Sequence, residues 1–139
     1  PSFGDVDEPT AIGSAFRLLA GIADKALALG KFGEAERVLG PSLENLEKDV
    51  ASGKGVGNES VEDGIEFAIR LTEGPRARDW IGWLFRIHTA AGIWMPLKRI
   101  ERMHELVRKA RYSDPRELRA YMMKLQTGSV LRPAERFLI

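Results

Sequence analysis

Apolar residues recur every three or four positions along most of the chain, and this spacing predicts α-helices. Such a period places the apolar side chains on one face of each helix, whereas a half-buried strand would alternate them at every second position. The periodic segments are separated by glycine and proline, which often end helices. The pattern therefore predicts an all-α fold of about six helices in antiparallel pairs.

The first two predicted helices flank a turn centred on Gly30, where a helix end favours a residue that tolerates positive φ. The first helix starts at Thr10 or Ser14, and the Phe32 ring is expected to wedge between the two helices. The second helix should kink or restart at Pro41, because proline lacks the N–H donor and clashes with the preceding turn. The expected inner faces contain Phe16, Leu19, Ile22, Ala23, Ala26, Leu27, Ala35, Val38, Leu39, Leu43 and Leu46.

The third and fourth predicted helices follow a glycine-rich connection at residues 52–58. This connection lacks the Gly-Lys-Ser/Thr sequence and the preceding strand of a phosphate-binding loop, so a surface loop is expected. Ser60 is the expected N-cap of the third helix, and the fourth runs from about Asp79 to Ala91. The expected inner faces are Val61, Ile65, Ala68, Ile69 and Thr72, then Trp80, Trp83, Leu84 and Ile87, with Phe85 and His88 at the margin.

The last two predicted helices start at Pro96 and after Pro115, and Gly128 closes the second of them. Their apolar stripes are Leu97, Ile100, Met103, Val107 and Ala110, then Leu118, Tyr121, Met122 and Leu125. Residues 131–139 end apolar and are expected to form a final turn on the bundle or the start of another helix. Residues 1–9 are acidic and contain two prolines, so a tail or linker is predicted there, followed by a single helical-repeat domain at residues 10–139.

Composition is that of an ordinary globular protein, with 139 residues, 44% hydrophobic and 29% charged. The absence of cysteine excludes disulfides and cysteine-based metal or redox chemistry. No apolar run approaches the roughly 18 residues that a membrane span needs, and no secretory signal is visible at the N-terminus. A cytoplasmic protein without membrane contact is therefore expected.

The net charge of +1 conceals a strong asymmetry between the two parts of the chain. Residues 1–73 carry 7 Lys/Arg and 14 Asp/Glu, a net charge of −7, whereas residues 74–139 carry 14 and 6, a net charge of +8. Such a distribution has two readings. The basic part binds an acidic partner, or the two parts of the chain attract each other.

The residues that could carry chemistry form no catalytic constellation. His88 and His104 lack the nearby carboxylates of a metal site, and the acidic residues of the second and third helices are expected to form solvated faces. No catalytic, metal or cofactor residue is therefore predicted. Trp80, Trp83 and Trp94 are interpreted as core residues, with an exposed groove of binding hot spots as the alternative.

The segment Gly30-Lys31-Phe32-Gly33-Glu34-Ala35 resembles the inter-helix turn of a tetratricopeptide-type repeat, and Gly92-Ile93-Trp94 followed by Leu97 repeats it in degenerate form. The chain has Leu19 where that family has its first tryptophan, and Pro41 falls inside its second helix. The resemblance implies a right-handed helical solenoid that serves as a scaffold, with a compact bundle as the other arrangement of the same helices.

A second resemblance covers residues 21–30, residues 34–39 and the closing Pro133-Ala134-Glu135-Arg136-Phe137-Leu138. These segments are similar to the helical region that follows a forkhead-associated domain in some bacterial signalling proteins. The resemblance implies an interaction module in phosphorylation-linked signalling, and the acidic start would be the linker from that domain.

These observations together predict a protein–protein interaction module that binds a peptide or helix of a partner, and no enzyme. The partner segment is expected to be acidic or phosphorylated and to bind Arg99, Arg102, Arg108 and Trp94 through charge-assisted hydrogen bonds and aromatic contact. A nucleic-acid-binding helical domain that uses the basic part is the first alternative, and a small all-α enzyme is the second. The oligomeric state is left open.

Overall fold

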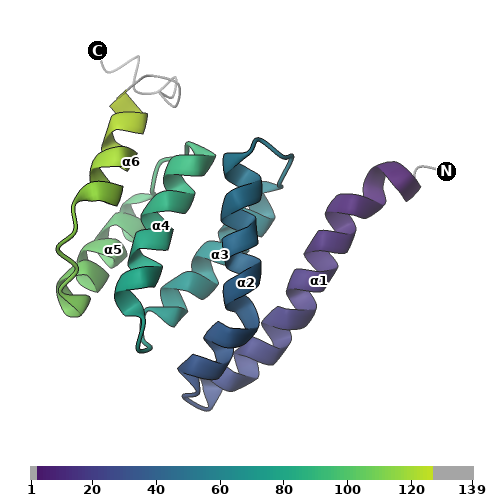
Figure 1. Cartoon of the computed structure of the whole chain (residues 1–139), viewed down its shortest axis with the longest axis horizontal. Helices are drawn as coiled ribbons and strands as arrows, with labels where there is room; N and C mark the ends of the chain where they lie inside the picture. Colours follow the sequence, from purple (N-terminus) through teal and green to yellow (C-terminus); the bar gives the residue numbers. More distant parts are fainter. Residues whose placement is uncertain (1–2, 127–139) are drawn as a thin grey trace.

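The computed structural model describes residues 3–126, with side chains from Phe16 onward, and contains six α-helices joined by short turns (Figure 1). They are α1 (Phe3–Ala28), α2 (Phe32–Ala51), α3 (Asn58–Leu71), α4 (Ala77–Ala91), α5 (Leu97–Ala110) and α6 (Arg116–Gln126). No strand occurs within residues 3–126, so the prediction of an all-α fold is confirmed for this part of the chain. The expectations for Gly128 and residues 131–139 lie outside the described residues.

The helices form two layers in which α4 has the central place. Helices α2, α4 and α6 lie side by side and are called the front layer, and α3 and α5 lie behind them (Figure 1). Helix α1 packs against α2, whereas α4 contacts α2, α3, α5 and α6. A helix surrounded in this way must be apolar on nearly all sides.

The sequence of α4 meets this demand, because eight of its residues are buried. Trp80 and Trp83, which are only 4% and 1% exposed, belong to the core, as predicted. Phe85 and His88, predicted at the margin, are buried as well. Trp94 follows α4 and is a partly buried residue packed against the same core.

Four helices end in the same backbone turn, the Schellman motif, in which the residue after the helix adopts a left-handed conformation. At the end of α4, Ile93 N donates to His88 O at 3.1 Å and Gly92, with φ +65°, donates to Thr89 O at 3.1 Å. Gly30 and Gly53 close α1 and α2 in the same way. Helix α5 ends in this motif too, but the left-handed residue there is Arg111, with φ +55°.

Phe32 joins the first pair of helices to the second. It is the first residue of α2, it is half-buried, and it packs beside Gly74 in the turn between α3 and α4. A Cβ atom on Gly74 would lie only 2.7 Å from the Phe32 Cβ, closer than two carbon atoms can approach. The ring therefore contacts the next helical pair as well as its own turn.

We expect the Gly74→Ala substitution to lower the free energy of unfolding by about 1–3 kcal/mol, the usual cost of overpacking. The clash involves Phe32 Cβ, which cannot move without the backbone of α2. Chemical denaturation followed by circular dichroism measures the change. Gly33→Ala is the matched control, because nothing lies within 4 Å of its new Cβ and alanine favours the helix. A Gly74→Ala protein as stable as Gly33→Ala would contradict the close contact.

Two helix starts and the course of α2 differ from the sequence predictions. Helix α1 already begins at Phe3, and α3 begins at Asn58 after Gly57 instead of at Ser60. Helix α2 runs without a restart through Pro41. Pro41 is exposed, so water can reach the carbonyl whose helical donor proline removes, while buried Leu39 and Leu43 hold the helix on its other side.

Several apolar residues predicted inside are exposed to solvent, namely Ile22, Leu97, Ile100, Leu118 and Met122. On α5 the inner face includes Arg99, a position outside the predicted stripe, and its largely buried side chain pairs with Glu62 of α3. The inner face of α5 then continues with Met103 and Leu106, and Leu97 is 71% exposed.

Tyr121 fixes α6 to the connection between α4 and α5. Its hydroxyl donates to Ile93 O at 2.8 Å and accepts from Met95 N at 3.0 Å. Within the described part of the chain, no helix combines the length and apolarity needed to cross a membrane.

Candidate interaction surface

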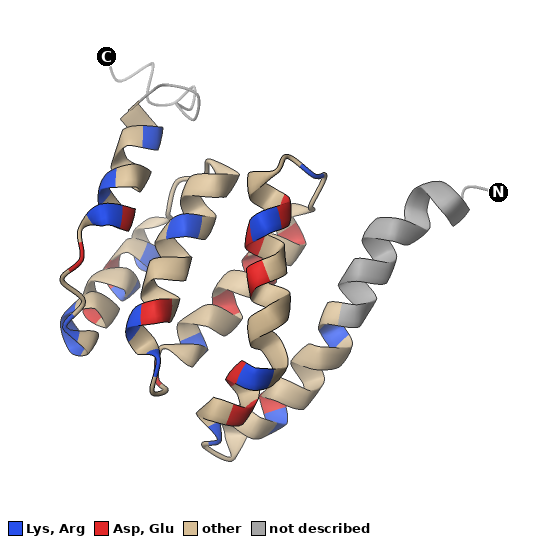
Figure 2. Cartoon of the chain, in the orientation of Figure 1, with Lys and Arg blue, Asp and Glu red and all other residues tan. Residues whose placement is uncertain are grey.

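The open side of α4 carries only charged residues where the helix is exposed. Arg78, Asp79 and Arg86 are its exposed residues, and Arg76 directly precedes the helix. The remaining faces of α4 are packed in the core. The exposed side chains therefore lie between α2 on one side and α6 with its preceding loop on the other. Basic and acidic side chains occur together on each of α2 to α6 (Figure 2).

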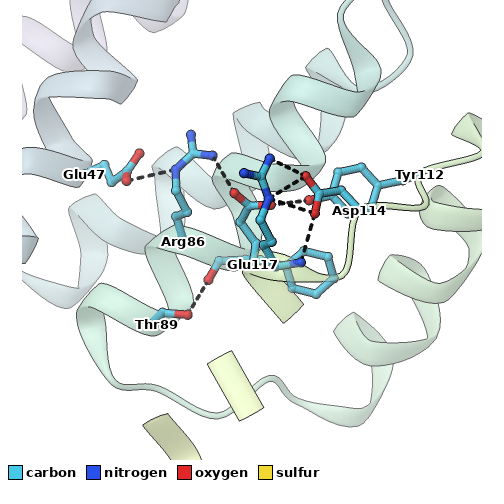
Figure 3. Close-up of polar contacts among 8 residues, drawn as sticks. Glu47, Arg86, Thr89, Tyr112, Asp114 and Glu117 are labelled. Atoms are coloured by element: carbon cyan, nitrogen blue, oxygen red, sulfur yellow. Dashed lines mark hydrogen bonds and ion pairs between the residues drawn. The ribbon is translucent and has the colours of Figure 1, made fainter. Parts of the chain in front are cut away.

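Arg86 links the three helices of the front layer. Its Nε donates to Glu47 of α2 at 3.0 Å, and its Nη1 lies 3.9 Å from Glu117 of α6 (Figure 3). Glu117 also accepts a hydrogen bond of 2.7 Å from the Tyr112 hydroxyl. Burial and this bond to a carboxylate raise the pKa of Tyr112, so the phenol keeps its proton and remains a donor.

Arg76 forms a second junction between α2 and α4. Its guanidinium donates to Glu36 at 3.1 Å and to Asp79 at 2.8 Å. The Trp80 indole N–H donates to the other oxygen of Glu36 at 2.8 Å. Glu36 therefore satisfies a core tryptophan and a surface arginine together.

The charge asymmetry of the chain is used inside the fold. Three arginines of the basic part pair with glutamates of the acidic part, namely Arg76 with Glu36, Arg86 with Glu47 and Arg99 with Glu62. The two parts of the chain thus attract each other, which is one of the two interpretations of the charge pattern. The other interpretation, binding of an acidic partner, requires basic residues that these three ion pairs do not neutralise.

Two hollows lie on either side of the Arg76–Arg86 stretch. The first, of about 390 Å³, lies between α2 and α4 and includes Arg37, Gly40 and Pro41 in its lining. The second, of about 450 Å³, lies between α4 and the α5–α6 connection. Both hollows share Arg76, Asp79 and Arg86, so they form one uneven surface across the front layer.

The second hollow is the more basic of the two. It is lined by five arginines and three carboxylates, namely Arg76, Arg78, Arg86, Arg111 and Arg116 with Asp79, Asp114 and Glu117. Gly82 also lines it, and a Cβ there would lie 3.2 Å from Arg86 Nη1 and 3.5 Å from the Tyr112 hydroxyl. The missing side chain leaves room for both polar groups.

The four partner-binding residues predicted from sequence do not share one surface. Arg99 is only 12% exposed, pairs with both oxygens of Glu62 and approaches His88 Nε2 at 3.2 Å. Arg102 is exposed and pairs with Glu105 at 3.3 Å, and Arg108 is exposed. Nine residues are about two and a half helical turns, so Arg99 and Arg108 point to opposite sides of α5. Trp94 packs against the core.

The two histidines lie in different environments, one buried and one exposed. His88 is fully buried, and its Nδ1 lies 2.7 Å from Leu84 O. Desolvation lowers the pKa of His88 to about 4, against a raising effect of the Leu84 carbonyl and a further lowering effect of Arg99. His104 is exposed. Among the described residues, no three His, Asp or Glu side chains are grouped to hold a metal ion.

The sequence did not single out Arg78 and Arg111, which both line the second hollow, as binding residues. A signal for Arg78 was present, because a cation in the first turn of a helix opposes the helix dipole and has no local benefit. Arg111 had no such signal, since only the structure shows that it takes the left-handed position usually given to glycine.

Comparison of the chain with models of known protein families, with curated proteins and with solved structures found no match. The arrangement of the side chains is therefore the basis of the functional argument.

Proposed function

We propose that this domain is a protein-interaction module that binds an acidic segment of a partner across the face formed by α2, α4 and α6. The observation that carries the proposal is the basic hollow of about 450 Å³ between α4 and the α5–α6 connection. An extended or helical segment laid over this hollow and the neighbouring one would contact three helices.

The proposal assigns the domain a binding role and no catalytic one. Recognition of an acidic segment needs complementary charge and shape, and the surface supplies both without an activated side chain. His88, whose pKa burial lowers to about 4, is fully buried in the core and has both ring nitrogens in contact with protein groups.

The wider setting of the domain is part of the same proposal. Its helices would stack as a right-handed solenoid similar to tetratricopeptide repeats, and it would act in the cytoplasm in bacterial signalling. The supporting features are the turn at Gly30 to Ala35 and the resemblance to regions that follow forkhead-associated domains.

A protein segment fits the surface better than a nucleic acid does. Asp79, Asp114 and Glu117 are interspersed among the arginines of the hollow, and they would repel a continuous row of phosphates. A peptide can place its acidic side chains at intervals that avoid these carboxylates.

Selection of peptides from a random displayed library on the immobilised domain tests the proposal. We expect the selected peptides to be rich in Asp and Glu and to shift the backbone amide resonances of residues 76–86 and 111–117 in NMR spectra. We also expect the double charge reversal Arg37→Glu with Arg78→Glu to weaken their binding at least tenfold, because two attractions become repulsions.

The matched control is the double charge reversal Arg102→Glu with Arg108→Glu, which changes the same charge on exposed positions of α5. Unchanged binding in this control would support the front-layer face. An equal or larger loss would transfer the site to α5, and tight, salt-sensitive binding of a 20-nucleotide DNA in place of peptides would contradict the proposal.

A further inference from the structure

Two arginines of the basic hollow have no carboxylate partner among the described residues. Each of the three carboxylates in the lining is already paired, Asp79 with Arg76, Asp114 with Arg116 and Glu117 with Arg86. Arg78 and Arg111 remain as cations without an ion pair in the part of the chain that the structure describes. The basic surplus of the hollow therefore lies on these two side chains.

The two arginines are tied to the same point of the fold. Arg78 Nε donates to Ala110 O at 2.9 Å, and Ala110 directly precedes Arg111. This bond uses only the inner nitrogen of the Arg78 guanidinium. The two terminal nitrogens of its planar fork have no hydrogen-bond acceptor among the described residues, and Arg78 is one of the residues that line the hollow.

The backbone at Arg111 is held in a conformation that favours glycine. Three of the four Schellman turns in the described chain place glycine at the left-handed position, at Gly30, Gly53 and Gly92. Only the fourth places a residue with a side chain there, and it is Arg111 with φ +55°. Backbone strain of this kind concentrates where a side chain is needed for function.

We propose that Arg78 and Arg111 form a binding site for one oxyanion, a phosphoryl or carboxylate group carried on the partner's acidic segment. This inference rests on the proposed function and names the chemistry of its central contact. Guanidinium forks bind both groups through paired N–H···O bonds, and a phosphoryl dianion can engage both arginines. Asp114, which also lines the hollow, has its carboxylate hydrogen-bonded to Arg116.

Three peptides of otherwise identical sequence provide the test, with phosphoserine, glutamate or serine at the central position. Each is titrated into the protein while the Nε–Hε resonances of Arg78 and Arg111 are followed by NMR. We expect both resonances to shift with the phosphoserine peptide. Equal affinity for the glutamate peptide would identify a carboxylate as a sufficient ligand, and the serine peptide should bind at least tenfold more weakly than either.

Two variants remove the cations one at a time. Arg111→Gly deletes the guanidinium and gives the left-handed position the residue that it favours, so thermal unfolding should show no loss of stability. Arg78→Gln deletes the other fork. We expect each variant to weaken binding of the phosphoserine peptide at least tenfold, and the exposed control Arg108→Gln to change it less than twofold.

The outcomes separate this site from the broader proposal. Library-selected acidic peptides that bind the wild type and Arg111→Gly equally, while shifting other residues of the front layer, would overturn the oxyanion site and leave the interaction module standing. Peptides that bind nowhere on the front layer would overturn both. Preference of the two arginines for an oligonucleotide over the phosphoserine peptide would overturn the assignment to a protein segment.

Discussion

The Trp83→Ala variant is expected to lose about 3–5 kcal/mol of unfolding free energy, the usual cost of removing a buried aromatic side chain. Trp83 is 1% exposed at the centre of α4, and its indole N–H donates to Leu43 O at 3.1 Å. Its ring also makes an edge contact with Trp80, with 6.1 Å between centroids. Since small domains have only about 5–15 kcal/mol in total, a large fraction of the variant will be unfolded under mild denaturant.

Urea unfolding followed by circular dichroism at 222 nm measures this loss. Leu97→Ala serves as the control, because Leu97 is a large apolar residue on the neighbouring helix that is 71% exposed. Its replacement should change the free energy of unfolding by no more than about 0.5 kcal/mol. Similar losses in the two variants would show that α4 is not the centre of the core.

Acidification from pH 6.5 to pH 4 is expected to destabilise the protein by about 3 kcal/mol through His88 alone. Burial lowers the pKa of His88 from 6.5 to about 4 in the folded protein, so the unfolded chain binds the proton first. The contribution of the neutral ring is therefore fully present above pH 6.5 and is lost as the pH falls toward 4. The Arg99 guanidinium lies beside His88 Nε2 and repels the protonated ring, whereas the Glu62 carboxylate attracts the protonated ring.

Denaturation midpoints measured between pH 7.5 and pH 4 test this dependence. The His88→Gln variant keeps an acceptor for Arg99 but cannot be protonated, so its midpoint should fall less over this interval. His104→Gln removes the exposed histidine and should retain the pH dependence of the wild type. A His88→Gln protein with an unchanged pH profile would exclude His88 as the origin.

Local sequence rules predict the helices and several of their ends well, because those features depend on short-range chemistry. The pairing of the helices is less predictable, since α6 packs chiefly against α4 and not against its neighbour in sequence, α5. The left-handed turns at Gly30 and Gly92 follow from a single residue each, because glycine tolerates positive φ. The inner face of α3 follows from its spacing, and Val61, Ile65, Ala68, Ile69 and Thr72 are all buried as predicted.

The errors arise where tertiary contacts outweigh the local pattern. Arg99 was expected to bind a partner, but its guanidinium lies inside and pairs with Glu62, 37 residues earlier in the chain. The inner face of α5 thus contains Arg99, Met103 and Leu106, whereas Leu97 and Ile100 are exposed. No spacing rule within α5 can show that Arg99 belongs to this face, because its partner is a carboxylate on another helix.

The candidate site was only partly predictable for the same reason. Basic character in the second part of the chain indicates an acidic partner, but each arginine contributes only if no glutamate neutralises it. Arg76 and Arg86 pair with glutamates of α2, whereas Arg78 and Arg111 pair with no described carboxylate. This distinction depends on the packing of the helices against one another.

The central place of α4 also determines how the domain can open. Helices α2, α3, α5 and α6 all contact α4, so its amide groups become accessible only when most of the core separates. Helix α6, in contrast, rests chiefly on α4 and can detach alone. The lining of the basic hollow includes residues of both α4, which opens last, and α6, which opens early. A ligand bound there would contact both helices and would therefore slow the fraying of α6.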